Sequence, residues 1–122
     1  MTYKDIQDKV VDRYRVTLDE HSCCYGRMHA HVRERRVCKW HPKNSVRATF
    51  DLLHEVGHIE TNRSGMRRAE QEYYATKWAL DRAAEFGIEI PASVRAIYQA
   101  YIDREVERGK RRGGTGYRTM VL

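Results

Sequence analysis

Residues 46–60 constrain the fold of this chain more than any other segment. Apolar or small residues recur there at i, i+4, i+7 and i+11, namely Val46, Phe50, Leu53 and Gly57. This spacing places them on one face of an α-helix, and such a face must be buried. Pro42 ends the preceding segment, and Asn44 or Ser45 can act as the helix N-cap. We therefore expect a buried helix over residues 46–60.

The N-terminal part predicts one helix and a hairpin. Ile6, Val10 and Tyr14 form an amphipathic stripe, so a helix is expected from Asp5 to Arg15. The stretch from Cys24 to Trp40 mixes apolar and polar residues and predicts two short antiparallel strands that turn near Arg33 to Arg35.

The C-terminal part predicts two further helices. One covers Met66 to Phe86 and is stopped by Gly87, and the last opens at Pro91 or Ala92. Glycines and basic residues from Gly109 onward indicate a flexible tail. The expected fold is α+β and mostly helical, with a small antiparallel sheet packed on the helix of residues 46–60. Residues 1–108 are expected to form one domain, and residues 109–122 are expected to form a basic, Gly-rich flexible tail.

Composition and cysteine usage favour a cytoplasmic protein. No apolar run approaches the roughly 18 residues that a membrane span needs. Met1 to Asp12 is charged and mixed, without the apolar core of a signal peptide. Cys23, Cys24 and Cys38 are an odd number with one adjacent pair, which is a poor disulfide framework, so reduced thiols are expected.

The net charge of +6 has two main sources, residues 33–43 and the segment from Arg104 to the end. A positive surface can attract nucleic acid or an acidic partner. A solvated surface with a loose tail is the simpler interpretation, so direct nucleic-acid binding is not favoured, and no membrane partner is expected.

The pentapeptide His54-Glu55-Val56-Gly57-His58 indicates a metal site. Histidines four residues apart on a helix project from the same side, about one turn apart. Both imidazoles can then bind one Zn²⁺ at about 2.0–2.1 Å. Glu55 is rotated by about 100° and can reach water on the metal instead of the metal itself. Glu55 is therefore the predicted general base, and His54 and His58 are predicted metal ligands.

A catalytic zinc also needs a third protein ligand, for which Glu60, Glu70 and Glu72 are candidates. Glu72 shares a helix face with small residues, namely Ala75, Thr76, Ala79 and Ala83. Glu70 falls about 160° away, on the polar side. A carboxylate on an alanine-rich packing face is costly unless it is paired or binds a metal. We therefore favour Glu72 as the third ligand; the alternative is that it pairs with an arginine such as Arg47.

Two segments resemble the ImmA/IrrE family of HExxH zinc metallopeptidases. Residues 47–58, Arg-Ala-Thr-Phe-Asp-Leu-Leu-His-Glu-Val-Gly-His, resemble its active-site helix. Residues 72–79, Glu-Tyr-Tyr-Ala-Thr-Lys-Trp-Ala, resemble its Glu-x-x-Ala-Asn-x-Phe-Ala segment, with Thr76 in place of the usual Asn. The resemblance implies a minimal zincin-like, gluzincin-like domain in which Glu72 is the third zinc ligand. It also implies cytoplasmic cleavage of helix-turn-helix repressors.

The expected function is that of a zinc-dependent endopeptidase whose substrate lies extended along an edge strand of the sheet. The alternative is a non-catalytic, zinc-containing binding module that sequesters a repressor or nucleic acid. Two other metal sites are less favoured. One would use Cys38 and His41 with Cys23 and Cys24, and the other would use His29 and His31, which share a strand face.

Overall fold

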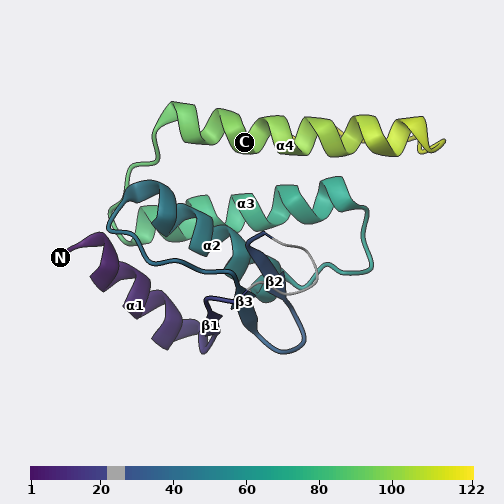
Figure 1. The fold of residues 1–122 in the computed structure, drawn as a ribbon. Helices are drawn as coiled ribbons and strands as arrows, with labels where there is room; N and C mark the ends of the chain where they lie inside the picture. Colours follow the sequence, from purple (N-terminus) through teal and green to yellow (C-terminus); the bar gives the residue numbers. More distant parts are fainter. Residues whose placement is uncertain (22–26) are drawn as a thin grey trace.

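The fold is α+β and mostly helical, as the sequence predicts. The computed structural model describes residues 1–21 and 27–122. Along these residues the elements are α1 (Tyr3–Tyr14), β1 (Thr17–Asp19), β2 (His29–His31), β3 (Arg36–Cys38), α2 (Val46–Thr61), α3 (Arg68–Glu85) and α4 (Ala92–Arg111) (Figure 1). No helix among the described residues is both long and apolar enough to cross a membrane.

The sheet has the order β1-β3-β2 and is mixed. Strands β2 and β3 are antiparallel and are joined by a turn at residues 32–35, which confirms the predicted hairpin turn. Strand β1 pairs in parallel with β3, so the prediction of a purely antiparallel sheet is wrong. A three-residue strand is too short to show alternation in the sequence, and pairing with β3 alone defines it. Cys24, the start of the predicted hairpin, lies outside the described residues.

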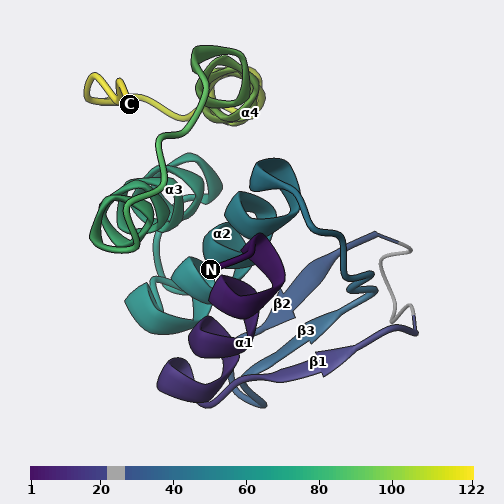
Figure 2. The same ribbon diagram turned by 90° about the vertical axis from the view of Figure 1, so that its left-hand side faces the viewer.

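Helix α2 is the centre of the core. Ser45 accepts a hydrogen bond from the backbone N–H of Ala48, and this cap starts the helix. Phe50, Leu53 and Val56 are fully buried. In Figure 2, α2 lies between the sheet on one side and α3 on the other. The predicted packing of the sheet on this helix is therefore confirmed.

Helices α2 and α3 cross at a point where only glycine fits. A Cβ atom built on Gly57 would lie 2.5 Å from the backbone oxygen of Ala75. Ala75, Ala79 and Ala83 are fully buried on the face of α3 that packs here. Small residues on both helices thus allow the backbones to approach closely, which brings side chains on α2 and α3 within reach of each other.

Helix α4 runs alongside α3 and continues past the predicted boundary at residue 108, to Arg111 (Figure 1). The segment after it folds back instead of extending as a loose tail. Met120 is 5% exposed and packs in a small cluster with Ala69 and Ile102. The backbone N–H of Leu122 donates to the side-chain oxygen of Gln99. Apolar residues at the end of a polar segment account for this difference, because burying them is favourable.

We predict that Gly57→Ala destabilises the fold. The added Cβ cannot fit against the Ala75 carbonyl without moving a helix backbone, and such overpacking costs about 1–3 kcal/mol. The measurement is denaturant unfolding in the presence of a chelator, so that metal binding does not contribute. Gly65→Ala is the matched control, because a Cβ there meets nothing within 4 Å. Equal stability of the two variants would contradict the proposed packing.

Candidate metal centre

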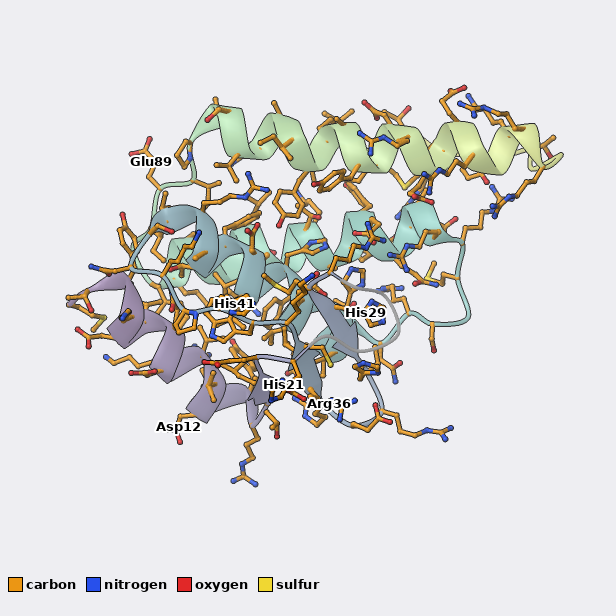
Figure 3. All side chains as sticks on the ribbon, viewed as in Figure 1. Asp12, His21, His29, Arg36, His41 and Glu89 are labelled. Carbon is orange, nitrogen blue, oxygen red and sulfur yellow. The ribbon has the colours of Figure 1, made fainter. Side chains whose placement is uncertain are left out.

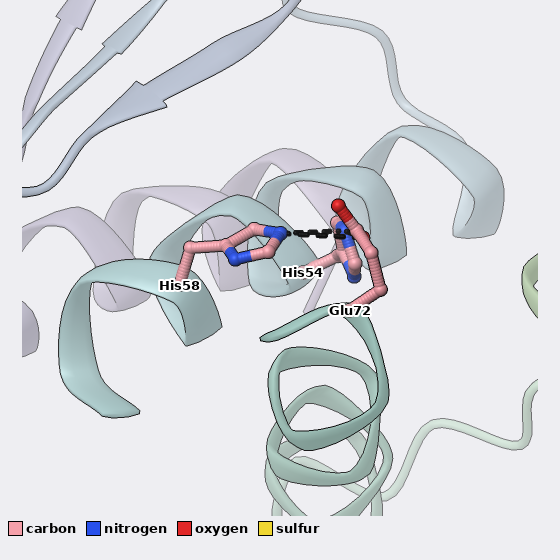
Figure 4. A group of neighbouring side chains, drawn as sticks. All are labelled: His54, His58 and Glu72. Carbon is pink, nitrogen blue, oxygen red and sulfur yellow. Dashed lines mark hydrogen bonds and ion pairs between the residues drawn. The ribbon is translucent and has the colours of Figure 1, made fainter. Parts of the chain in front are cut away.

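His54 and His58 from α2 converge with Glu72 from α3 (Figure 4). The Nε2 atoms of the two histidines are 3.2 Å apart. Oε2 of Glu72 lies 3.0 Å from Nε2 of His54 and 3.3 Å from Nε2 of His58. His54 and Glu72 are buried, and His58 is partly exposed. These three residues are the predicted ligand set, and they form a cluster that can hold a metal ion.

The other carboxylates considered as ligands lie elsewhere. Glu60 pairs with the guanidinium of Arg35. Glu70 is partly exposed near the start of α3 and does not belong to the cluster. Glu72, the glutamate on the alanine-rich face of α3, is thus the one that reaches the histidines.

The alternative pairing of Glu72 with Arg47 is not observed. Nε of Arg47 lies 2.9 Å from Oδ1 of Asp51, one turn along α2. Oε1 of Glu72, the oxygen that faces away from the histidines, lies 3.0 Å from Nη2 of Arg68. One oxygen of Glu72 thus remains directed at the two imidazoles.

Thr76 fixes the orientation of His54. Its buried hydroxyl donates to the backbone oxygen of Glu72 at 2.7 Å, so its only hydrogen is used. Nδ1 of His54 lies 3.1 Å from the same hydroxyl oxygen and must be the donor in that contact. This bond places the neutral ring's proton on Nδ1 and leaves Nε2 free as a ligand. Helical periodicity predicts that Thr76 shares a face with Glu72, but it indicates no role for the hydroxyl.

The protonation of Glu72 and the protonation of His54 depend on each other. Burial alone would raise the pKa of Glu72, but hydrogen bonds from His54 and His58 lower it well below the usual range of a glutamate. Burial alone would lower the pKa of His54, whereas its hydrogen bond to Glu72 and the surrounding carboxylates raise it. Without a metal, these two shifts favour a proton on His54 beside a charged Glu72. A divalent cation can take that place.

The donor set fits zinc. Two imidazole nitrogens and one carboxylate oxygen are a ligand combination typical of catalytic zinc, which keeps a fourth position open. The bond from Nδ1 of His54 to Thr76 is the kind of outer interaction that orients metal-binding histidines. Glu72 supplies the negative charge that a buried dication requires.

Glu55 lies in the cleft beside this cluster. Burial raises the pKa of its carboxyl, and the charges of His54 and His58 oppose that change. A carboxylate with a raised pKa is a better proton acceptor near neutral pH. This environment agrees with the predicted role of Glu55.

The cleft has a volume of about 420 Å³ and is formed by four elements. Helix α2 contributes the two histidines and Glu55. Residues from Met28 to Ala30, at and before β2, form one wall, and Tyr98 and Tyr101 of α4 lie on another. The ring of Tyr98 packs against that of His54, with 4.7 Å between centroids. The fourth contribution is the N-terminal part of α3.

The less favoured metal sites gain no support. Among the residues that the structure describes, the cluster on α2 and α3 is the only group of three potential ligands within coordinating distance of one another. Cys38 is buried and His41 is exposed, and Cys23 and Cys24 lie outside the described residues. The other histidine pair sits on β2, and its member His29 lies apart from His41 (Figure 3).

Comparisons of this chain with protein-family models, with curated proteins and with solved structures found no match. The resemblance to the ImmA/IrrE family thus stays a prediction based on residues 47–58 and 72–79.

We predict that Glu72→Gln weakens zinc binding by more than the roughly 10–100-fold that changes outside the first ligand shell usually cause. The amide keeps the shape of the side chain but removes its charge. Zinc affinity measured by competition with a chromogenic chelator provides the test. Glu70→Gln is the matched control on the same helix, and equal affinities of the two variants would exclude Glu72 as a ligand.

Thr76→Val should lower zinc affinity by about 10–100-fold, because His54 loses the acceptor that orients its ring. The same chelator competition measures this effect. Thr76→Ser retains the hydroxyl and should bind zinc nearly as well as the unmodified protein. An unchanged affinity in the valine variant would show that His54 is oriented by packing alone.

Proposed function

We propose that this protein is a zinc-dependent endopeptidase. The observation that carries the proposal is the convergence of His54, His58 and Glu72 beside a cleft that also contains Glu55. Structural zinc sites are usually closed by four protein ligands, whereas catalytic sites use three and keep one position for water or substrate. A three-ligand set that borders a cleft supports the catalytic type.

Each residue then has a defined role. His54, His58 and Glu72 hold the ion, and Thr76 and Arg68 hold two of those ligands in place. A bound zinc ion supplies a Lewis acid that polarises a carbonyl and lowers the pKa of water toward about 7. Glu55 accepts the proton of the attacking water and delivers it to the leaving amine. The raised pKa of Glu55 suits both steps.

Strand β2 offers a place for an extended substrate. It lies at the edge of the sheet, and its residues form one wall of the cleft. A peptide can pair with the backbone of an edge strand and extend the sheet by one strand. This arrangement would lay the scissile bond beside the metal ligands and Glu55.

The identity of the substrate comes from the resemblance alone. Members of the ImmA/IrrE family act in the cytoplasm on helix-turn-helix repressors, and the helix, sheet, helix, helix order of this chain is compatible with a minimal zincin-like domain. We therefore propose a cytoplasmic, DNA-binding repressor as the protein substrate.

We predict that Glu55→Gln retains zinc but loses peptide hydrolysis by about 100–10,000-fold, the usual contribution of a general base. Zinc content and the cleavage of a mixed-sequence fluorogenic peptide library are measured on the same sample. Glu70→Gln should keep both properties. Undiminished cleavage by the Glu55 variant would show that Glu55 is not the general base. If the unmodified protein and both variants bind zinc but cleave no peptide, the non-catalytic alternative is favoured.

A further inference from the structure

The walls of the cleft are rich in arginine. Five arginines line it, namely Arg27, Arg47, Arg68, Arg104 and Arg108. Four carboxylates face them, namely Asp51, Glu55, Glu72 and Glu105. A bound divalent cation would add further positive charge at the centre. The cleft is therefore set to attract a negatively charged ligand.

Three of the arginines already have carboxylate partners within the cleft. Arg47 pairs with Asp51, Arg68 pairs with Glu72, and Arg108 lies 3.1 Å from Glu105. Arg27 and Arg104 form no ion pair with any residue in the described ranges 1–21 and 27–122. Both are exposed.

Arg104 is well placed to meet a substrate. Its guanidinium lies 5.6 Å from the ring centroid of Tyr101, which lines the same cleft and is 39% exposed. Tyr101, Arg104 and Arg108 follow at i, i+3 and i+7, so they share one face of α4. That face lines the same cleft as the residues at and before β2, along which the substrate is proposed to lie.

The positive charge continues past the cleft in one direction. A second cavity of about 280 Å³ shares Arg68, Glu105 and Arg108 with the cleft and adds Arg112. It lies along the C-terminal half of α4. At the other end of the cleft, Arg47 is neutralised by Asp51 and contacts the ring of Tyr98. Because Arg68 and Arg108 also have carboxylate partners, the surplus positive charge toward the C-terminal half of α4 comes from Arg104 and Arg112.

We propose that the cleft selects polypeptides with aspartate or glutamate on one side of the cleaved bond, and that Arg104 is the main specificity-determining residue. This inference depends on the proposed peptidase function. A guanidinium binds a carboxylate through two parallel hydrogen bonds, which gives geometric selectivity as well as charge. A polypeptide is favoured over a nucleic acid because β2 presents backbone groups that only a peptide strand can extend.

The test uses the zinc-loaded protein and quenched fluorogenic peptide mixtures. Each peptide mixture has Glu, Gln or Lys fixed at one position. In separate mixtures this position lies before or after the centre of the peptide. Fixed Glu on one side should raise kcat/KM about two- to fivefold over Gln, because Arg104 is exposed and a solvent-exposed ion pair contributes about that much to binding. Fixed Lys at the same position should lower it.

Arg104→Glu should abolish the preference for Glu and improve cleavage of the Lys mixture. Arg95→Glu is the matched control: it makes the same charge change at an exposed position of α4 that does not line the cleft. Equal cleavage of the Glu and Gln mixtures by the unmodified protein would overturn the proposed selectivity and leave the peptidase function intact.

A binding measurement separates the two proposals. Fluorescence anisotropy with zinc-loaded Glu55→Gln compares labelled Glu and Gln mixtures without turnover. If no mixture is cleaved but Glu mixtures bind about two- to fivefold tighter in an Arg104-dependent manner, recognition stands and the peptidase function fails. If neither cleavage nor selective binding occurs, the selectivity for acidic polypeptides is excluded. It is also excluded if duplex DNA, and none of the peptide mixtures, binds in an Arg104-dependent manner.

Discussion

The structure depends on the burial of one carboxylate between two helices. Glu72 is 8% exposed, and removing a charged group from water costs several kcal/mol unless partners replace the lost hydration. Two imidazoles and the guanidinium of Arg68 provide such partners. They come from the neighbouring helix and from one turn earlier on α3. The same contacts that make the burial tolerable therefore assemble a ligand set.

The packing of α2 on α3 makes this convergence possible. Gly57 lies between His54 and His58 in the sequence, and its missing side chain lets the backbone of α3 approach at Ala75. Thr76, next to Ala75, then reaches Nδ1 of His54. Gly57 and Ala75, which set the helix separation, thus lie beside the residues of the candidate metal site on the same two helices. A change in the packing should therefore alter the candidate metal site.

Most of the helical fold and the residues of the candidate metal site could be predicted from the sequence, because helical periodicity is a strong signal over long segments. The apolar spacing in residues 46–60 gave the central helix, and the position of Glu72 on an alanine face identified the glutamate that meets the histidines. Strand β1 could not be predicted, since three residues show no pattern without their partner. The return of Met120 to the core depends on a tertiary contact.

The side chains that shape the cleft were also beyond the sequence. Its arginines come from α2, from α3, from α4 and from the residues before β2, and only the folded chain brings them together. The sequence shows an excess of basic residues at positions 33–43 and from Arg104 onward, but it does not show which of them lie near the histidines. The role of Thr76 was missed for a related reason, because it requires the direction of one hydroxyl hydrogen.

The central claim is that one zinc ion binds to His54, His58 and Glu72. X-ray absorption at the zinc edge, on protein carrying one equivalent of zinc, tests it most directly. The account predicts a first shell of nitrogen and oxygen only, at about 2.0–2.2 Å, with the multiple-scattering pattern of two imidazoles. Sulfur at about 2.3 Å would instead indicate a site at the cysteines and would contradict the account.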